Sequence, residues 1–478
     1  MQIIDDFSDD VESFLELAEE ALAELGFGPE GVVAANSVEG EESEAADNVV
    51  TLNVAEDETE TSDADISDGE ASADMAEEPE QTTEVELPEE LPVLETPVAE
   101  ESAQLTASDP VSFELADGVD EDIAEIFQTP MTGHYNWDYS DANTRIKKLY
   151  ELGKKLNWDG AIDLDWSKGI GRDEFPVKAE MIARLEGPLA ALPEKDRLEY
   201  MRHDQAWALS QFLHGEQGAL LVASQLVSCA PTYQAKLYAA SQTFDEARHV
   251  EVFARYLQRI HGLEYPCNKN LKALLDKTLT DPRWDLKFIG MQIVIEGLAL
   301  AAFQTTKETS NCPLLRQLVH YVIRDEARHV TFGINYLTEF LQTLSQEELE
   351  DRAQFAYEAC VVMRNRIINT ELPAKWFGIS EEEILEMVAT DETQDIFNNL
   401  LFNRVMPNLK KIGLLTDKVL PLYEKLNLLS FADEDNDFEV DWADMNKPLE
   451  TSKEIDIQSE QQLKTSQEFM DQALQKSI

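Results

Sequence analysis

Apolar and polar positions follow the helical period almost throughout residues 140–412. The apolar or amphipathic segments are separated by short stretches that contain Pro, Gly or Asn, among them "SCAPTY", "HGLEYPCN", "TDPRWD" and "SNCPLL". The sequence shows no alternating strand pattern of useful length. We therefore predict an all-α fold.

Four long helices form the centre of this prediction. They are expected at residues 203–229, 232–261, 282–308 and 313–343. Helices of about 30 residues are about 45 Å long, enough to form a bundle with one core. Shorter helices are expected near residues 176–191 and over 346–371, 380–390 and 393–412.

Charge divides the chain into three parts. Residues 1–130 hold 41 acidic and no Lys or Arg residues, and residues 431–478 hold 13 acidic and four basic residues. The central part, 131–430, holds 42 acidic and 34 basic residues. Polar, like-charged segments cannot bury a core, so we expect two disordered acidic ends around one helical domain. Within the first of them, helical spacing of apolar residues over 4–25 predicts a short amphipathic helix that docks on a partner or on its own domain.

The same composition excludes several classes of partner. Acidic ends repel phosphate groups, so neither nucleic acid nor an anionic membrane is expected. The sequence shows no secretory signal and no run of about 18 uncharged apolar residues that would predict a membrane span. The four cysteines are scattered without a CxxC pair, which predicts neither a disulfide framework nor a thiolate metal site. We expect a cytoplasmic protein.

The hexapeptide DEARHV occurs twice, at residues 245–250 and 325–330. Each copy holds a glutamate and a histidine three positions apart, and an isolated glutamate stands 30 positions before the glutamate of each copy. Two predicted helix pairs thus carry the same residue types at the same spacing. The six residues are Glu216, Glu246, His249, Glu296, Glu326 and His329.

This spacing places the six side chains at one level of a bundle. The midpoints between the paired glutamates are Pro231 and Asn311, which both lie in predicted turns. About 15 residues to the turn and 15 back bring both carboxylates to one height, roughly 22 Å from the bend. A glutamate and a histidine three positions apart share one helix face. Two such hairpins can therefore bring all six residues together in one core.

Burial of these carboxylates requires compensating charge. Glu216 is the only charged residue between Asp204 and Lys236, and no charged residue other than Glu296 lies between Lys287 and Lys307. Burying one unpaired carboxylate costs several kcal/mol. A single DEARH copy would also fit a salt-bridged surface helix, but two copies with two isolated glutamates favour metal binding. The oxygen-rich, nitrogen-containing set suits two iron ions, or manganese in one or both sites, better than a closed zinc site.

In order and spacing, these residues resemble the ligands of the ferritin-like non-haem di-iron carboxylate proteins. The resemblance covers about residues 200–343 and implies a ferritin-like four-helix bundle, with its core at 203–343 and additional flanking helices. It implies one ion at each ligand triplet, with a carboxylate shared: Glu216, Glu246 and His249, and Glu296, Glu326 and His329. It also implies that two acids orient the histidine of the opposite motif while two arginines balance their charge. These four residues are Asp245, Arg248, Asp325 and Arg328.

The residues at three places in the sequence help to distinguish between the branches of this family. Phe253 stands where ribonucleotide reductase small subunits keep a radical tyrosine, which disfavours that role. Val322 stands where amine N-oxygenases of the family carry a third histidine, which counts against that chemistry without excluding it. Ala299 and Leu300 stand where bacterial multicomponent hydroxylases tend to have a threonine.

The favoured function is that of an oxygenase or oxidase that uses O₂ to hydroxylate, desaturate, epoxidise or N-oxidise a small organic or acyl substrate. Flavin, nicotinamide and iron–sulfur motifs are not visible, so a separate reductase or ferredoxin is expected to supply electrons. The alternative is an iron-handling ferroxidase or rubrerythrin-like peroxide scavenger without an organic substrate. A homodimer is one possible assembly. Apolar residues expected to line the substrate site are Leu213, Leu220, Phe253, Leu300 and Phe303.

Several other residues invite a functional interpretation that we do not favour. Tyr256 and Tyr336 follow the two DEARHV copies at matching positions, and core packing is preferred over a redox relay. His214 and His320 do not fall on the ligand face, and we interpret both as structural.

Overall fold

The computed structural model describes residues 127–129, 131–140, 144–185, 187–389 and 401–433. The helix expected at 4–25 and nearly all of both acidic ends lie outside the described residues. The division into tails and a central domain therefore stays a prediction.

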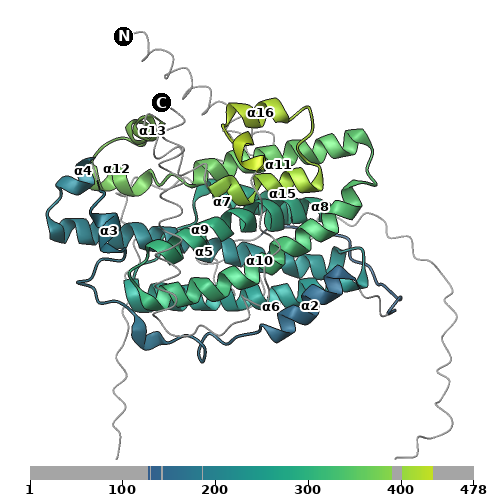
Figure 1. Ribbon diagram of the computed structural model, residues 1–478, viewed down its shortest axis with the longest axis horizontal. Helices are drawn as coiled ribbons and strands as arrows, with labels where there is room; N and C mark the ends of the chain where they lie inside the picture. Colours follow the sequence, from purple (N-terminus) through teal and green to yellow (C-terminus); the bar gives the residue numbers. More distant parts are fainter. Residues whose placement is uncertain (1–126, 130, 141–143, 186, 390–400, 434–478) are drawn as a thin grey trace, which may run out of the picture. The chain divides into compact units, whose positions relative to one another are not determined.

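Four long helical segments form the centre of the structure (Figure 1). α5 (Glu194–Cys229) and α6 (Tyr233–Tyr256) form one hairpin, and α9 (Glu296–Thr309) and α10 (Pro313–Leu341) form the other. Both turns fall where the sequence placed them. In the described residues the only strand-like pairing is an isolated bridge between Val177 and Ser310, which confirms the all-α fold.

Local sequence signals explain where these helices begin. The side chain of Thr232 accepts a hydrogen bond from the backbone N–H of Ala235 at the start of α6. α10 begins with Pro313, whose missing N–H would have had no partner in the first turn. α11 (Gln346–Arg366) begins with a reciprocal capping box between Ser345 and Glu348.

The remaining described helices flank the bundle. They are α2 (Arg145–Lys155), α3 (Ala179–Ile182), α4 (Gly187–Ala191), α7 (Lys269–Thr280), α8 (Trp284–Phe288), α12 (Glu371–Phe377), α13 (Glu381–Ala389), α15 (Met406–Ile412) and α16 (Leu420–Lys425). Among the predicted ranges, 176–191 is split into α3 and α4, 346–371 ends earlier as α11, 380–390 corresponds to α13, and 393–412 has α15 at its end. α5 begins before residue 203, and α7 was not predicted.

The predicted helix at 282–308 is a composite of three segments. α8 leads into π-helical turns at Ile289–Ile295, which continue directly into α9. A second π-helical turn at Leu257–His261 ends the hairpin helix α6. The segment "IGMQIVI" is buried on all sides, so its sequence carries no period that distinguishes a π-helix from an α-helix.

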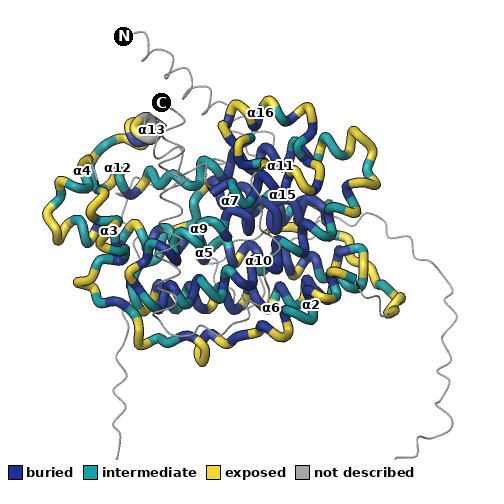
Figure 2. Tube along the Cα trace, in the orientation of Figure 1, coloured by how far each residue is buried: buried dark blue, intermediate teal, exposed yellow. Residues whose placement is uncertain are grey.

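The bundle is covered on two sides by other helices (Figure 2). α2 packs on α6 and α10, while α11 packs on α7 and on the π-helical turns before α9. One segment of the described chain, Trp284–Thr309, is long and apolar enough to cross a membrane, but 83% of its most apolar window is buried. Burial within the bundle identifies it as a core helix of this fold.

Candidate metal centre

The structure brings all six predicted residues together in the bundle core. Their ligand atoms form two overlapping groups, and within each group the atoms lie within 4.8 Å of one another. Glu246 and Glu326 belong to both groups. Glu216 and His249 complete the first group, and Glu296 and His329 complete the second. All six residues are buried, with exposed fractions of 5% or less.

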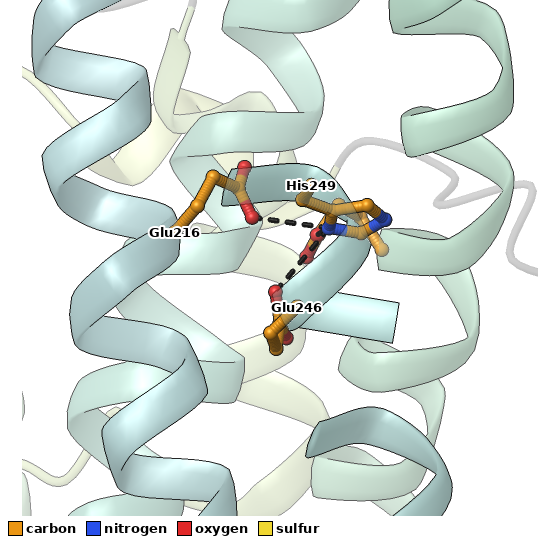
Figure 3. Close-up of side chains that lie close together, drawn as sticks. Glu216, Glu246 and His249 are labelled. Atoms are coloured by element: carbon orange, nitrogen blue, oxygen red, sulfur yellow. Dashed lines mark hydrogen bonds and ion pairs between the residues drawn. The ribbon is translucent and has the colours of Figure 1, made fainter. Parts of the chain in front are cut away.

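His249 directs one ring nitrogen at a ring of carboxylates. Its Nδ1 atom lies 3.1 Å from Glu216 Oε2 and 3.3 Å from Glu246 Oε2 (Figure 3). The same atom lies 3.1 Å from Glu326 Oε1. Its Nε2 atom lies 3.1 Å from Asp325 Oδ2. Because Asp325 accepts from Nε2–H, Nδ1 is the ring nitrogen that faces the three carboxylate oxygens and is the one that could bind a metal ion.

His329 has the corresponding arrangement on the other hairpin. Its Nδ1 atom lies 3.1 Å from Glu246 Oε1 and 3.4 Å from Glu326 Oε2. Its Nε2 atom lies 3.3 Å from Asp245 Oδ2. The two imidazole rings lie 6.1 Å apart, centre to centre. Each histidine thus lies against the aspartate of the opposite DEARHV copy, which is the pairing that the resemblance implies.

The inward-facing atoms lack other partners among the described residues. Hydrogen-bond partners are missing for five buried atoms: Glu246 Oε2, Glu296 Oε2, both carboxylate oxygens of Glu326 and His329 Nδ1. Buried polar atoms are normally paired, and an unpaired carboxylate is especially costly. Four carboxylates carry four negative charges, which two divalent cations would balance. The donor set therefore fits two metal ions.

The two aspartates and two arginines that surround the histidines neutralise one another. Arg248 donates to Asp245 Oδ1 at 2.5 Å and to Asp325 Oδ2 at 2.9 Å. Arg328 donates to Asp245 Oδ2 at 3.0 Å and to Asp325 Oδ1 at 2.7 Å. Each arginine thus bridges both aspartates. This Asp–Arg quartet is neutral, so its two arginines are balanced by the aspartates and not by the four glutamates.

The pKa values of the clustered glutamates and histidines are shifted in the direction that an excess of buried negative charge produces. Burial, together with the charge of Glu326, raises the pKa of Glu216 and that of Glu296 well above the ordinary value. Burial alone would lower the pKa of His249, but Glu216 and Asp325 raise it well above its ordinary value. The pKa of His329 is raised in the same way by Glu246 and Glu326. The cluster thus attracts positive charge, whether as protons or as metal ions.

Two buried glutamines that were not predicted also contact this cluster. Gln242 donates to Glu246 Oε1 at 3.0 Å and to Glu296 Oε1 at 2.8 Å. Gln292 donates to the side-chain oxygen of Gln242 at 3.4 Å. Each glutamine stands four positions before a ligand glutamate, so it shares that glutamate's helix face. This four-residue spacing is the sequence signal that could have identified both glutamines.

Two aromatic residues beside the centre were also not predicted. Trp158 donates its indole N–H to Asp325 Oδ2 at 2.7 Å. Tyr238 is buried with its ring 6.5 Å from that of His329, and its hydroxyl has no hydrogen-bond partner among the described residues. Trp158 lies far from both DEARHV copies in the sequence, and Tyr238 does not belong to the repeated spacing. The sequence therefore gives no signal for either residue.

The other residues considered in the sequence lie outside the cluster. His214 Nε2 lies 2.8 Å from the backbone oxygen of Tyr265, and His320 Nδ1 lies 3.2 Å from Lys307 Nζ. Tyr256 is buried in an apolar cluster, and the hydroxyl of Tyr336 donates to Thr232 Oγ1 at 3.2 Å.

Comparison with known proteins places the chain in a family. The family model described as P-aminobenzoate N-oxygenase AurF matches residues 139–413, which is more than half of the 478-residue chain. The chain belongs to the AurF family. The matched region contains both hairpins and all six clustered residues. Membership holds although Val322 stands where a third histidine was expected for amine N-oxygenases.

The solved structures that match the chain are distant from it. An R2-like ligand-binding oxidase with an aerobically reconstituted metal cofactor after photoconversion is 17% identical, with a TM-score of 0.40. A point mutant of R2-like ligand-binding oxidase with an aerobically reconstituted Mn/Fe cofactor is 17% identical, with a TM-score of 0.42. Each match covers 57% of this chain and 95% of the other. No curated protein matches the chain.

Family and site agree on the class of protein. The AurF family is one of oxygenases, and the bundle core presents a donor set that fits two metals. The protein is therefore an O₂-dependent oxidoreductase of the ferritin-like dimetal type, which acts on an organic substrate. The iron-handling alternative is not supported, because the family is defined by oxidation of an organic molecule.

Proposed function

We propose that the six clustered residues hold two iron ions with which the protein oxidises a small aromatic substrate. The observation that carries this proposal is the set of four buried carboxylates and two imidazole nitrogens aimed at one space, with five of their atoms lacking a hydrogen-bond partner among the described residues. Glu246 and Glu326 would contact both ions, because they belong to both ligand groups. When bound, the metal pair supplies the reduction of O₂ and the oxidising power.

The chain's own residues fix the geometry of this centre. The Asp–Arg quartet holds both imidazoles with Nδ1 directed inward, and Gln242 holds carboxylates from two different hairpins. Burial keeps bulk water away from the ligands. The donor set suits iron and also accommodates manganese, so metal analysis of the purified protein decides between them.

An aromatic substrate is favoured by the surroundings of α5. Phe212, Phe253 and Phe303 form an aromatic cluster one to two turns from the ligands, with ring centres 4.7–6.0 Å apart. Of the apolar residues expected here, Leu213, Phe253, Leu300 and Phe303 are buried, and Leu220 is half-buried.

A cleft of about 450 Å³ opens further along α5, and its lining is largely aromatic. Trp207, one of its lining residues, lies nine positions before Glu216, or about 14 Å along the helix. We infer that the substrate enters by this cleft and passes the phenylalanine cluster. The cleft is lined by His203, Trp207, Tyr265, Glu371, Leu372, Lys375 and Trp376.

Two observations bear on which atom of the substrate is oxidised. The family's name describes oxygenation of the nitrogen of an aromatic amine, which makes arylamines the first substrates to test. Val322 departs from the pattern expected for that reaction, so aromatic substrates without an amine form the second set.

The deciding experiment combines metal analysis with product formation. Protein loaded anaerobically with Fe(II) and reduced with dithionite is exposed to O₂ with and without arylamines, and products are identified by mass spectrometry with ¹⁸O₂. We expect label in the product and loss of bound iron in Glu326→Ala. Glu339→Ala, an exposed glutamate on the same helix, is the matched control. Fe(II)-dependent O₂ consumption that no organic molecule alters would contradict the proposal.

Three further expectations belong to this proposal. A separate protein supplies the electrons, since the described residues and the sequence motifs account only for the dimetal centre. A cytoplasmic location is supported by four cysteines that are all free, as expected in a reducing compartment. A homodimer remains a proposal that sedimentation analysis can test.

A further inference from the structure

α2 carries an unusual concentration of positive charge for this protein. Its sequence RIKKLYELGKK contains five basic residues and one acidic residue, whereas the whole chain has 38 basic and 96 acidic residues. Lys148, Lys154 and Lys155 are exposed, and Lys154 pairs with Glu151 at 2.8 Å. At physiological salt the Debye length is about 8 Å, so a bound partner responds to these local charges more than to distant acidic residues.

An exposed apolar strip of α6 lies beside these lysines. Ala240, Phe244 and Ala247 share one face of the helix and are exposed, with Phe244 61% exposed. Phe244 is the one large apolar side chain of this strip, and the two alanines beside it extend the apolar surface that a protein partner could cover. We call the surface formed by Lys148, Lys154, Lys155 and this strip of α6 the α2–α6 face.

The two helices run side by side in the same direction (Figure 1). A Cβ atom on Gly153 would lie 3.8 Å from Ser241 Oγ, and Asn157 Oδ1 accepts from Arg248 at 2.8 Å. Lys154 and Lys155 therefore lie at the level of Phe244. The face ends at the loop after α2, where exposed Asp159 and Asp163 reverse the charge.

A continuous chain of contacts leads from this face to the metal centre. The guanidinium of Arg248 lies 5.5 Å from the ring centre of Phe244 and 4.8 Å from that of Trp158. Trp158 donates to Asp325 at 2.7 Å, and the same Asp325 oxygen lies 3.1 Å from His249 Nε2. Four contacts thus connect a solvent-exposed aromatic side chain with a ligand of the centre.

We infer that the α2–α6 face docks a small acidic protein that carries single electrons, and that this contact delivers electrons to the metal centre. The inference rests on the proposed function. Each carrier is oxidised by one electron and the centre is reduced by one. Two such transfers, with two protons, balance the insertion of one oxygen atom of O₂ into the substrate and the release of the other as water. Trp158 and Asp325 conduct the electron and undergo no net redox change.

Charge complementarity is the reason for an acidic carrier. Lysines on the rim of an interface steer an oppositely charged partner and orient it. The apolar strip then supplies the dry contact at which the electron crosses. The same lysines would repel a basic carrier.

Binding of an acidic carrier can be measured on the full chain without any turnover. The probe is an oxidised acidic [2Fe–2S] ferredoxin, titrated by calorimetry at 0.15 M salt. We expect Lys154→Glu/Lys155→Glu to weaken binding by about tenfold or more, because two attractive contacts become repulsive. Phe244→Ala, which changes no charge, should also weaken it. The matched control is Lys418→Glu/Lys425→Glu, which changes the net charge equally on exposed residues around α16, at the opposite edge of the bundle (Figure 1).

The results separate docking from catalysis. Equal losses of affinity in both lysine pairs, or no binding by the wild-type chain, would overturn the inference. A second measurement compares the reduction of the iron-loaded protein by reduced ferredoxin and by dithionite. The Lys154→Glu/Lys155→Glu variant should be slower with ferredoxin and unchanged with dithionite. Failure of dithionite-reduced wild-type protein to oxidise any substrate would instead contradict the proposed function.

Discussion

The side-chain amide of Gln242 joins carboxylates from two different hairpins. It donates to Glu246 and Glu296, and its own oxygen accepts from Gln292. Groups that orient metal ligands typically change metal affinity by about 10–100-fold when they are removed. We expect Gln242→Leu to weaken Fe(II) or Mn(II) binding by about that factor, measured by competition with a chelator. Gln234→Leu on the same helix should leave the affinity unchanged.

Arg328 is a fully buried charge whose only described ion-pair partners are two aspartates. Arg328→Met would leave Asp245 and Asp325 with one cationic partner instead of two. Loss of one partner from a buried ion pair costs about 3–5 kcal/mol, and we expect that loss in urea unfolding. Arg255→Met, which breaks a surface pair with Glu251, should cost about 1 kcal/mol or less. Similar costs for both variants would show that the quartet contributes little.

The predictability of the centre differs from residue to residue. The six clustered side chains follow from spacing alone, because a glutamate and a histidine three positions apart must share a helix face and equal arm lengths must place them at one height. Gln242 was missed because its four-residue spacing from Glu246 places it on the ligand face but does not by itself show that it contacts a ligand. Trp158 reaches Asp325 from a loop 167 positions away, and loop geometry is not encoded by a helical period.

At the scale of helices, two glycines show how closely the elements of the centre approach. A Cβ atom on Gly333 would lie 2.7 Å from Cβ of Gln292, whereas one on Gly215 would meet nothing within 4 Å. Alanine is favoured over glycine inside a helix by about 1 kcal/mol. We expect Gly215→Ala to stabilise the protein by about 0.5–1 kcal/mol and Gly333→Ala to destabilise it by about 1–3 kcal/mol, since overpacking outweighs propensity there. Stabilisation by both substitutions, in urea unfolding, would show that the contact at Gly333 can relax.

The helix boundaries could be predicted only where capping residues or prolines mark them. α10 begins at the predicted Pro313. α5 was predicted to begin at residue 203, but it extends back through the charged segment "EKDRLEYMRHD" to Glu194. Two acids, Glu194 and Asp196, lie in its first turn, where negative charge interacts favourably with the helix dipole. α7 was missed because it lies between two segments that were both interpreted as turns.

At the scale of the whole molecule, metal binding is expected to be a major source of stability. The metal-free cluster concentrates four carboxylates in the core, and binding of cations to the folded state alone shifts the folding equilibrium. At a free metal concentration 100 times Kd, one site adds about 2.7 kcal/mol. We expect Fe(II) or Mn(II), added anaerobically, to raise Tm by roughly 5–10 °C over protein in EDTA. The Glu326→Ala variant should lose most of this difference, and an unchanged wild-type Tm would contradict metal binding at the cluster.

The π-helical turns at Ile289–Ile295 have a consequence for how this gene can change. A π-helical turn holds one more residue than an α-helical turn, and it stands immediately before Glu296. The wide turn absorbs the extra residue, so deleting one codon within it would favour a regular α-helix and leave the residues on either side with their present facing. The same deletion inside α9 would instead rotate the residues on its two sides by about 100° relative to one another, so single-residue indels should be tolerated better in the π-helical turns than in the helix that follows.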